Sequence, residues 1–103
     1  MKQRLIEQTF SRADEYLIDL KGVNFFNEES NIVGLAYLAR AEIAYNIHYL
    51  KTEYRAYIFD KIVPHELAHL LAHQRFKTIG SHGKVFQMCF RITTGQEVYR
   101  DPK

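Results

Sequence analysis

The stretch PHELAHLLAH at residues 64–73 constrains this chain most strongly, because it combines an apolar helix with four polar side chains. Leucines and alanines surround the stretch on nearly every side, and a helix of that kind is usually buried. Buried histidine and glutamate side chains destabilise a fold unless their polar atoms find partners. Any structure of this chain must therefore enclose the helix and also satisfy His65, Glu66, His69 and His73.

The first part of this stretch, HELAH at residues 65–69, fits the pattern His-Glu-x-x-His. Residues four apart on a helix lie about 6 Å apart along the axis and on nearly the same face. This spacing predicts that His65 and His69 share one tetrahedral zinc ion. Zinc lowers the pKa of a bound water, and Glu66, projecting beside the metal, is placed to take the proton. The pattern therefore predicts hydrolysis of an amide bond by an activated water.

A third protein ligand is needed to complete such a site. His73 continues the helical series, but its Cα would lie about 9 Å along the axis from a zinc held midway between the first two histidines. His82 lies in the loop 78–83, thirteen residues after His69, where a turn can fold the chain back over the metal. Gly83 gives the backbone conformational freedom there. His82 is the favoured ligand, and its alternatives are an exposed loop residue or a helix cap.

Other interpretations stay open. Glu97 offers a carboxylate ligand from downstream, and His48 is expected to be structural or on the surface. The HELAH helix could also be free of metal, with its histidine rings at the boundary of the core. The five-residue pattern alone does not decide between these interpretations, because it has three fixed positions and also occurs on ordinary helices.

Composition limits the class of protein. With 103 residues, of which 47% are hydrophobic, the chain predicts one packed domain and excludes disorder. A net charge of +2 is too small to imply nucleic acid by itself. Cys89 is the one cysteine, so an internal disulfide and a four-cysteine zinc ribbon are excluded. The N-terminus lacks an apolar signal segment, so we expect a cytoplasmic protein with no membrane partner. The sequence assigns no oligomeric state.

Hydrophobic periodicity predicts an α+β arrangement, with helices near both ends and around HELAH and with strands between them. The expected elements are a helix at 2–20 stopped by Gly22, strands at 23–26, 32–40 and 41–46, a helix at 65–76, and a last helix from Val85 to Gly95. The two later strands are so close that they predict a hairpin. Pro64 interrupts a helical run from Ile47, so it either starts a new helix or kinks a long one. Cys89 falls on the apolar stripe of the last helix and is expected in the core.

Two segments together carry a family resemblance. VPHELAHLL (63–71) followed by SHGKVFQ (81–87) resembles the SprT-like zinc metallopeptidases, which include bacterial SprT proteins and the catalytic domain of the eukaryotic Spartan protease. Members carry His-Glu-x-x-His and then His-Gly-x-x-Phe at the start of a further helix. The upstream segment VGLAYLARAEIAYN (33–46) is also similar, with Gly34 in one strand and Asn46 at the end of the next.

The resemblance implies a zincin-like α+β fold with a small three-stranded sheet beside the active-site helix, forming a single domain over 1–103. It implies zinc held by His65, His69 and His82, with Glu66 as general base. The chain lacks the zinc ribbon or long tail that many members carry, so dependence on DNA is not implied. Four basic residues in the last third could contact phosphates, or form a solvated face. They are Lys77, Lys84, Arg91 and Arg100.

The leading hypothesis is thus a zinc-dependent endopeptidase that cleaves protein or peptide substrates, with DNA-associated proteins as one class. The alternative is a zinc-stabilised, DNA-associated binding module with little or no peptidase activity. One of several tyrosines could donate a hydrogen bond to the oxyanion of the reaction, but the sequence does not choose among them. These are Tyr37, Tyr45, Tyr49, Tyr54 and Tyr57.

Overall fold

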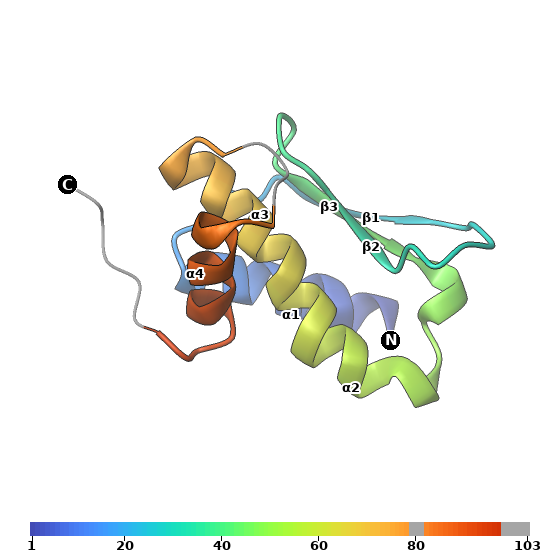
Figure 1. The fold of residues 1–103 in the computed structure, drawn as a ribbon. Helices are drawn as coiled ribbons and strands as arrows, with labels where there is room; N and C mark the ends of the chain where they lie inside the picture. Colours follow the sequence, from blue (N-terminus) through green and yellow to red (C-terminus); the bar gives the residue numbers. More distant parts are fainter. Residues whose placement is uncertain (79–81, 98–103) are drawn as a thin grey trace.

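A computed structural model describes residues 1–78 and 82–97, and it shows an α+β fold arranged around one central helix (Figure 1). The major elements are α1 (Lys2–Glu15), β1 (Gly22–Phe26), β2 (Gly34–Tyr37), β3 (Glu42–Asn46), α3 (Val63–Phe76) and α4 (Lys84–Thr93). Short helical turns join the sheet to α3, namely η1 (Ile47–Tyr49), η2 (Thr52–Tyr54), α2 (Arg55–Tyr57) and η3 (Ile58–Ile62). The α+β class predicted from the sequence is confirmed. No helix in the described ranges is long and apolar enough to cross a bilayer.

The first helix is shorter than predicted. α1 ends at Glu15, and Leu17 takes a left-handed conformation with φ of 58°. The N–H of Ile18 donates to the Ala13 carbonyl at 2.8 Å, and that of Leu17 donates to Asp14 at 3.1 Å. This pair of bonds is the helix-ending pattern in which glycine is the usual left-handed residue. The prediction of a helix to residue 20 was wrong, because the left-handed position that ends the helix is occupied by Leu17 and not by glycine.

The sheet has the strand order β1-β3-β2, so β3 lies in the middle. β2 and β3 are antiparallel, with Gly34 opposite Tyr45 and Tyr37 opposite Glu42, which confirms the predicted hairpin. β2 covers only residues 34–37 of the predicted strand 32–40. β1 pairs with the other side of β3 in parallel, from Gly22 opposite Glu42 to Phe26 opposite Asn46. β2 is therefore an edge strand, and it is the strand that packs next to α3.

Asn46 fixes the loop that leads into β2. Its side chain is fully buried, and its Nδ2 donates to the carbonyls of Glu28 at 2.8 Å and of Ile32 at 2.9 Å. Its Oδ1 accepts from the N–H groups of Glu28 at 3.3 Å and of His48 at 3.1 Å. All of the amide's polar atoms are thereby used, as burial requires. The segment around Ile32 is held in one position next to β2.

Pro64 does not stop the helical run but changes its register. η3 is a π-helix in which the N–H of Val63 donates to the Ile58 carbonyl, five residues back. The next bond in that register would run from residue 64 to the Phe59 carbonyl, but proline has no N–H. Nη1 of Arg12 donates to that carbonyl instead, at 3.2 Å, and Nη2 donates to the Thr93 carbonyl at 2.8 Å. One guanidinium thus joins α1, η3 and the end of α4.

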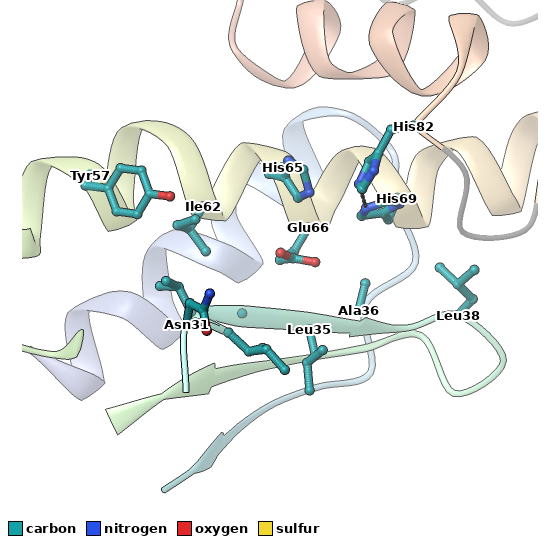
Figure 2. Close-up of a pocket in the computed structure, with 13 residues that line it drawn as sticks. Asn31, Leu35, Ala36, Leu38, Tyr57, Ile62, His65, Glu66, His69 and His82 are labelled. Atoms are coloured by element: carbon teal, nitrogen blue, oxygen red, sulfur yellow. Dashed lines mark hydrogen bonds between the residues drawn. The ribbon is translucent and has the colours of Figure 1, made fainter. Parts of the chain in front are cut away.

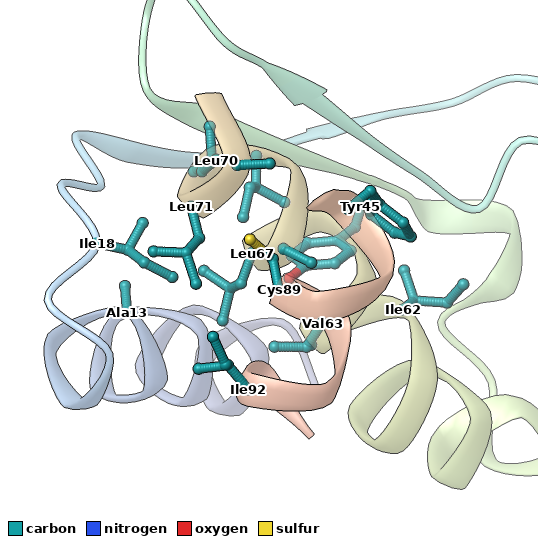
Figure 3. Packing of buried hydrophobic residues seen from close by; sticks show 14 of the residues in the cluster. Ala13, Ile18, Tyr45, Ile62, Val63, Leu67, Leu70, Leu71, Cys89 and Ile92 are labelled. Atoms are coloured by element: carbon teal, nitrogen blue, oxygen red, sulfur yellow. The ribbon is translucent and has the colours of Figure 1, made fainter. Parts of the chain in front are cut away.

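The core is centred on α3, as the sequence predicted for this helix. Leu67, Ala68, Leu70 and Leu71 are fully buried between α1, α4 and the sheet, and Figure 3 shows several of these side chains converging with others of the cluster. Cys89 of α4 packs in the same cluster, as expected, and burial raises the pKa of its thiol to about 11. His65, Glu66 and His69 therefore lie on the side of α3 that faces the cleft, whereas Gln74 and Arg75 bond the segment after α1.

We expect Arg12→Ala to lower the free energy of unfolding by roughly 2–3 kcal/mol, because two carbonyls lose a charged hydrogen-bond donor. For a chain of this size that corresponds to a fall in Tm of roughly 10–20 °C, measured by circular dichroism. Arg4→Ala on the same helix is the matched control, since Arg4 makes no hydrogen bond or ion pair within the described residues. Equal losses in both variants would show that the Arg12 bridge contributes nothing specific.

Candidate metal centre

Three histidines converge at the open side of α3. His65 and His69 lie one turn apart on that helix, and His82 approaches from the segment just before α4 (Figure 2). One ring nitrogen from each residue lies within 4.8 Å of the others, and Nε2 of His69 lies 3.0 Å from Nε2 of His82. The backbone of His82 is anchored by Gln87 of α4, whose Nε2 donates to the His82 carbonyl at 3.3 Å. The structure therefore brings the three predicted ligands together.

The surroundings keep the helical pair neutral. Burial, followed by the charges of His65 and His82, lowers the pKa of His69 to about 4. Burial and the neighbouring His82 also lower the pKa of His65. A neutral imidazole presents the nitrogen lone pair that binds a metal ion. His65 and His69 thus have the protonation state that metal binding requires at neutral pH.

The ring of Phe86 packs against all three imidazole rings. Its ring centroid lies 4.9 Å from that of His65, 4.5 Å from that of His69 and 4.8 Å from that of His82. The side chain itself is buried and belongs to the hydrophobic core. Because a packed aromatic ring restricts the rotamers of the residues against it, Phe86 orients the imidazoles before any ion arrives.

Glu66 is an almost fully buried carboxyl group, exposed by 6%, and it forms no hydrogen bond or ion pair with any described residue. Burial alone raises the pKa of Glu66 to about 7. No buried side-chain oxygen or nitrogen of the described residues lacks a partner, so the Glu66 oxygens still contact solvent in the cleft that this residue lines. A largely buried carboxyl group with a raised pKa at the wall of a cleft is typical of functional sites. Figure 2 shows it between the histidines and β2, facing the same space as the imidazoles.

Gly34 allows β2 to approach this carboxyl group. A Cβ at residue 34 would lie 2.9 Å from Cγ2 of Ile62 and 3.3 Å from Cγ and Oε2 of Glu66. The first distance is shorter than real Cβ contacts, so a side chain at this position would force strand and helix apart. The role of Gly34 in the site is thus steric, since it makes room for Glu66 and Ile62.

A cleft of about 510 Å³ runs between β2 and α3 and opens onto the histidines and Glu66. Its other walls are mostly apolar and come from the segment around β2 and from the helical turns before α3. They are Asn31, Ile32, Val33, Gly34, Leu35, Ala36, Leu38, Tyr57 and Ile62. The sequence gives Ile32 and Ile62 no distinguishing signal, and Tyr57 is one of five candidate tyrosines. No local pattern reveals these residues, because the cleft joins elements that are far apart in the chain.

The remaining histidines and the acidic candidate lie elsewhere. Nδ1 of His73 lies 3.1 Å from the Thr78 carbonyl at the end of α3. Glu97 is half exposed and forms an ion pair with Arg91 at 3.2 Å. His48 lies in η1, beside Asn46. None of the three joins the metal-binding group that the described residues form.

The site and fold can now be compared with known proteins. A model of the SprT-like family matches residues 3–100. The chain belongs to the SprT-like family. Among curated SprT-like relatives, Protein SprT of Glaesserella parasuis serovar 5 (strain SH0165) is 40% identical over 62 residues, which cover 60% of this chain and 39% of the relative. No solved structure matches the chain significantly.

Two further SprT-like relatives extend the match. Protein SprT of Proteus mirabilis (strain HI4320) is 39% identical over 83 residues, which cover 79% of this chain and 49% of the relative. Protein SprT of Klebsiella pneumoniae subsp. pneumoniae is 36% identical over 70 residues, which cover 68% of this chain and 42% of the relative. In each case the match spans less than half of the relative's length.

The SprT-like site fits a tetrahedral ion such as zinc. Zn–N bonds of about 2.0–2.1 Å at tetrahedral angles put nitrogen ligands about 3.4 Å apart. The three nitrogens here span up to 4.8 Å, with 3.0 Å between His69 and His82, so small side-chain rotations would bring them to that spacing. Three imidazoles leave the fourth position open, which is the arrangement of catalytic rather than structural zinc sites.

We expect His82→Ala to lower the affinity for zinc by 10-fold or more, because the variant keeps only two of the three imidazole ligands. Zinc content after dialysis, measured by mass spectrometry, reports this loss, and circular dichroism confirms that the fold remains. His73→Ala is the matched control, since its ring bonds a backbone carbonyl outside the cluster. Full zinc retention in His82→Ala would remove His82 from the ligand set.

Proposed function

We propose that this chain is a zinc-dependent endopeptidase in which His65, His69 and His82 hold the metal and Glu66 is the general base. The observation that carries the proposal is the convergence of three imidazoles with one buried carboxyl group that has no hydrogen-bond or ion-pair partner among the described residues. Membership of the SprT-like family supports it. The ligand set leaves room for a water and a substrate oxygen.

A zinc ion held by His65, His69 and His82 would supply a Lewis acid for the substrate carbonyl and would lower the pKa of a bound water. Glu66 accepts the proton of the attacking water and later passes it to the leaving amine. Glu66 directly follows His65, and its carboxyl group faces the cleft between the histidines and β2 (Figure 2), outside the group of three ring nitrogens. It would therefore lie beside a bound ion rather than among its ligands. The apolar walls around it keep bulk water away from the transferred proton.

The shape of the cleft supports a peptide substrate. β2 is an edge strand, and its residues Gly34, Leu35 and Ala36 line the cleft along its length. An exposed strand edge carries backbone groups to which an extended peptide can pair. A peptide lying between β2 and α3 would place one of its carbonyl groups near the histidines.

Glu66→Gln tests the assignment of the base. We expect the variant to keep zinc and its thermal stability but to lose at least 10³-fold in kcat/KM on an unfolded protein substrate, because the amide cannot accept the proton. Hydrolysis is followed by mass spectrometry of the products, and Glu97→Gln is the control because that carboxylate lies outside the cleft. Cleavage by Glu66→Gln at the wild-type rate would refute the proposed role.

A second candidate is association with DNA, and one observation favours it. A cavity of about 360 Å³ is lined by Arg4, Arg12 and Arg55, with Asp60 as the one acidic lining residue. Arg4 and Arg55 form no ion pair within the described part of the chain. This basic cavity lies on α1, α2 and η3, and its lining includes none of the residues in which the sequence suggested phosphate contacts.

Those residues offer a weaker case. Lys77 and Lys84 are exposed, Arg91 is paired with Glu97, and Arg100 lies outside the described residues. If the arginine cavity binds DNA phosphates, a double variant Arg4→Gln, Arg55→Gln should lower affinity for single-stranded DNA. It should also reduce the slope of log K against log salt by about 1.4, since each phosphate contact contributes about 0.7.

Fluorescence anisotropy at several salt concentrations measures both quantities. The double variant Lys77→Gln, Lys84→Gln removes the same charge from the other region and is the matched control. A slope reduced only by the lysine variant would assign DNA contact to the region predicted from the sequence, and no binding at all would exclude the second candidate.

A further inference from the structure

Tyr57 is a large, exposed side chain at one end of the cleft. It lies in α2, it is 49% exposed, and it lines the same cavity as His65 and Glu66. Its hydroxyl group forms no hydrogen bond with any described residue. Figure 2 shows the ring lying along the helical wall of the cleft, with its hydroxyl end toward Ile62. Neither the histidine cluster nor the core accounts for this side chain.

The π-helical segment puts Tyr57 on the same side as the metal-binding residues. Tyr57 and His65 are eight residues apart, which on a regular α-helix would separate them by about 80° around the axis. η3 contains one wide turn, which takes up one extra residue. The two residues then behave as a pair spaced seven apart, about 20° from each other around the axis. The register change caused near Pro64 therefore brings Tyr57 to the cleft.

Two isoleucines line the same cleft as Tyr57: Ile62 is largely buried, at 9% exposed, and Ile32 is more open to solvent. Ile62 lies on the helical side, and Ile32, 40% exposed, lies on the strand side and is held by the hydrogen bond of its carbonyl with Asn46. Exposed apolar surface within a concave site is typical of a ligand-binding region. The rigid position of Ile32 means that this region exists before a ligand binds.

The distance from Tyr57 to the site corresponds to a few residues of substrate. Seven effective residues at 1.5 Å per residue put Tyr57 roughly 11 Å along the axis from His65. An extended peptide advances about 3.3 Å per residue, so this distance corresponds to about three residues. A side chain at that distance from the cleaved bond would lie between the ring and the two isoleucines.

We infer that Tyr57, Ile62 and Ile32 form a subsite that selects an apolar or aromatic side chain about three residues from the cleaved peptide bond. The inference rests on the proposed endopeptidase function and names its substrate class: extended, unfolded segments with an apolar residue at that spacing. Tyr57 is a specificity-determining residue that does not touch the reacting atoms. Folded proteins are excluded because they do not offer such a segment.

Paired peptide substrates test the selection. Each peptide has one cleavage position, and the residue two, three or four places away on either side is leucine in one member of the pair and serine in the other. We expect the wild-type protein to favour leucine by about tenfold in kcat/KM at one of these positions, and Tyr57→Ala to reduce the preference to twofold or less. Tyr57→Phe should retain the preference, because the ring and not the hydroxyl group makes the contact.

Tyr54→Ala is the matched control, because Tyr54 is similarly exposed but lies outside the cleft. An unchanged leucine preference in Tyr57→Ala would overturn the subsite while leaving the endopeptidase function intact. Absence of any hydrolysis by the wild-type protein would instead count against the proposed function, so the two failures are distinguishable.

A binding measurement decides on the subsite without catalysis. The chain contains no tryptophan, so a peptide with one tryptophan reports its own environment by fluorescence. With zinc-loaded Glu66→Gln protein, tryptophan placed three residues from the cleavage position should shift its emission to the blue. Adding Tyr57→Ala should abolish the shift and weaken binding about tenfold. The same shift and affinity with and without Tyr57 would refute the inference, whether or not the wild-type protein cleaves peptides.

Discussion

One constraint dominates the structure: α3 must be the centre of a small core and also present polar groups to solvent. Leu67, Leu70 and Leu71 occupy the buried sides, and His65, Glu66 and His69 share the side that faces β2. A helix packed on three sides cannot shift without opening the core. The two histidines on α3 are therefore held by the core packing, which favours a preorganised site. The same packing buries the carboxyl group of Glu66, and this burial raises its pKa.

Arg12 and Pro64 show how a backbone irregularity supports the site. Proline leaves the Phe59 carbonyl without its helical donor, and the guanidinium of Arg12 replaces that donor from another element. The same guanidinium binds the Thr93 carbonyl, and the Thr93 hydroxyl group donates to the Pro64 carbonyl at 2.8 Å. These bonds close a ring of contacts from α1 through the start of α3 to α4. These bonds thereby stabilise the wide turn of η3. They also fix how the side chains before α3 are oriented.

The sequence predicts the parts of this structure that depend on local pattern. The HELAH spacing, the glycine after His82 and the hairpin before Ile47 are short-range signals, and the three histidines do lie together. The end of α1 was missed because Leu17 adopts a conformation for which glycine is the usual signal. The parallel pairing of β1 with β3 depends on long-range contacts, which periodicity does not encode. The π-helix was missed for a related reason, since its apolar residues follow ordinary helical spacing and only the bonding register differs.

Gly34 connects the chemistry of the site with its selectivity. The close approach of β2 at this residue brings the strand against both Glu66 and Ile62. Contact with Glu66 removes water from the carboxyl group, and contact with Ile62 sets the width of the cleft on the side of Tyr57. A wider gap at residue 34 would hydrate the base and loosen the apolar subsite together, although neither residue would have changed. The two properties are therefore not independent, because a single strand-to-helix distance determines both the solvation of Glu66, the proposed general base, and the width of the cleft at the proposed subsite.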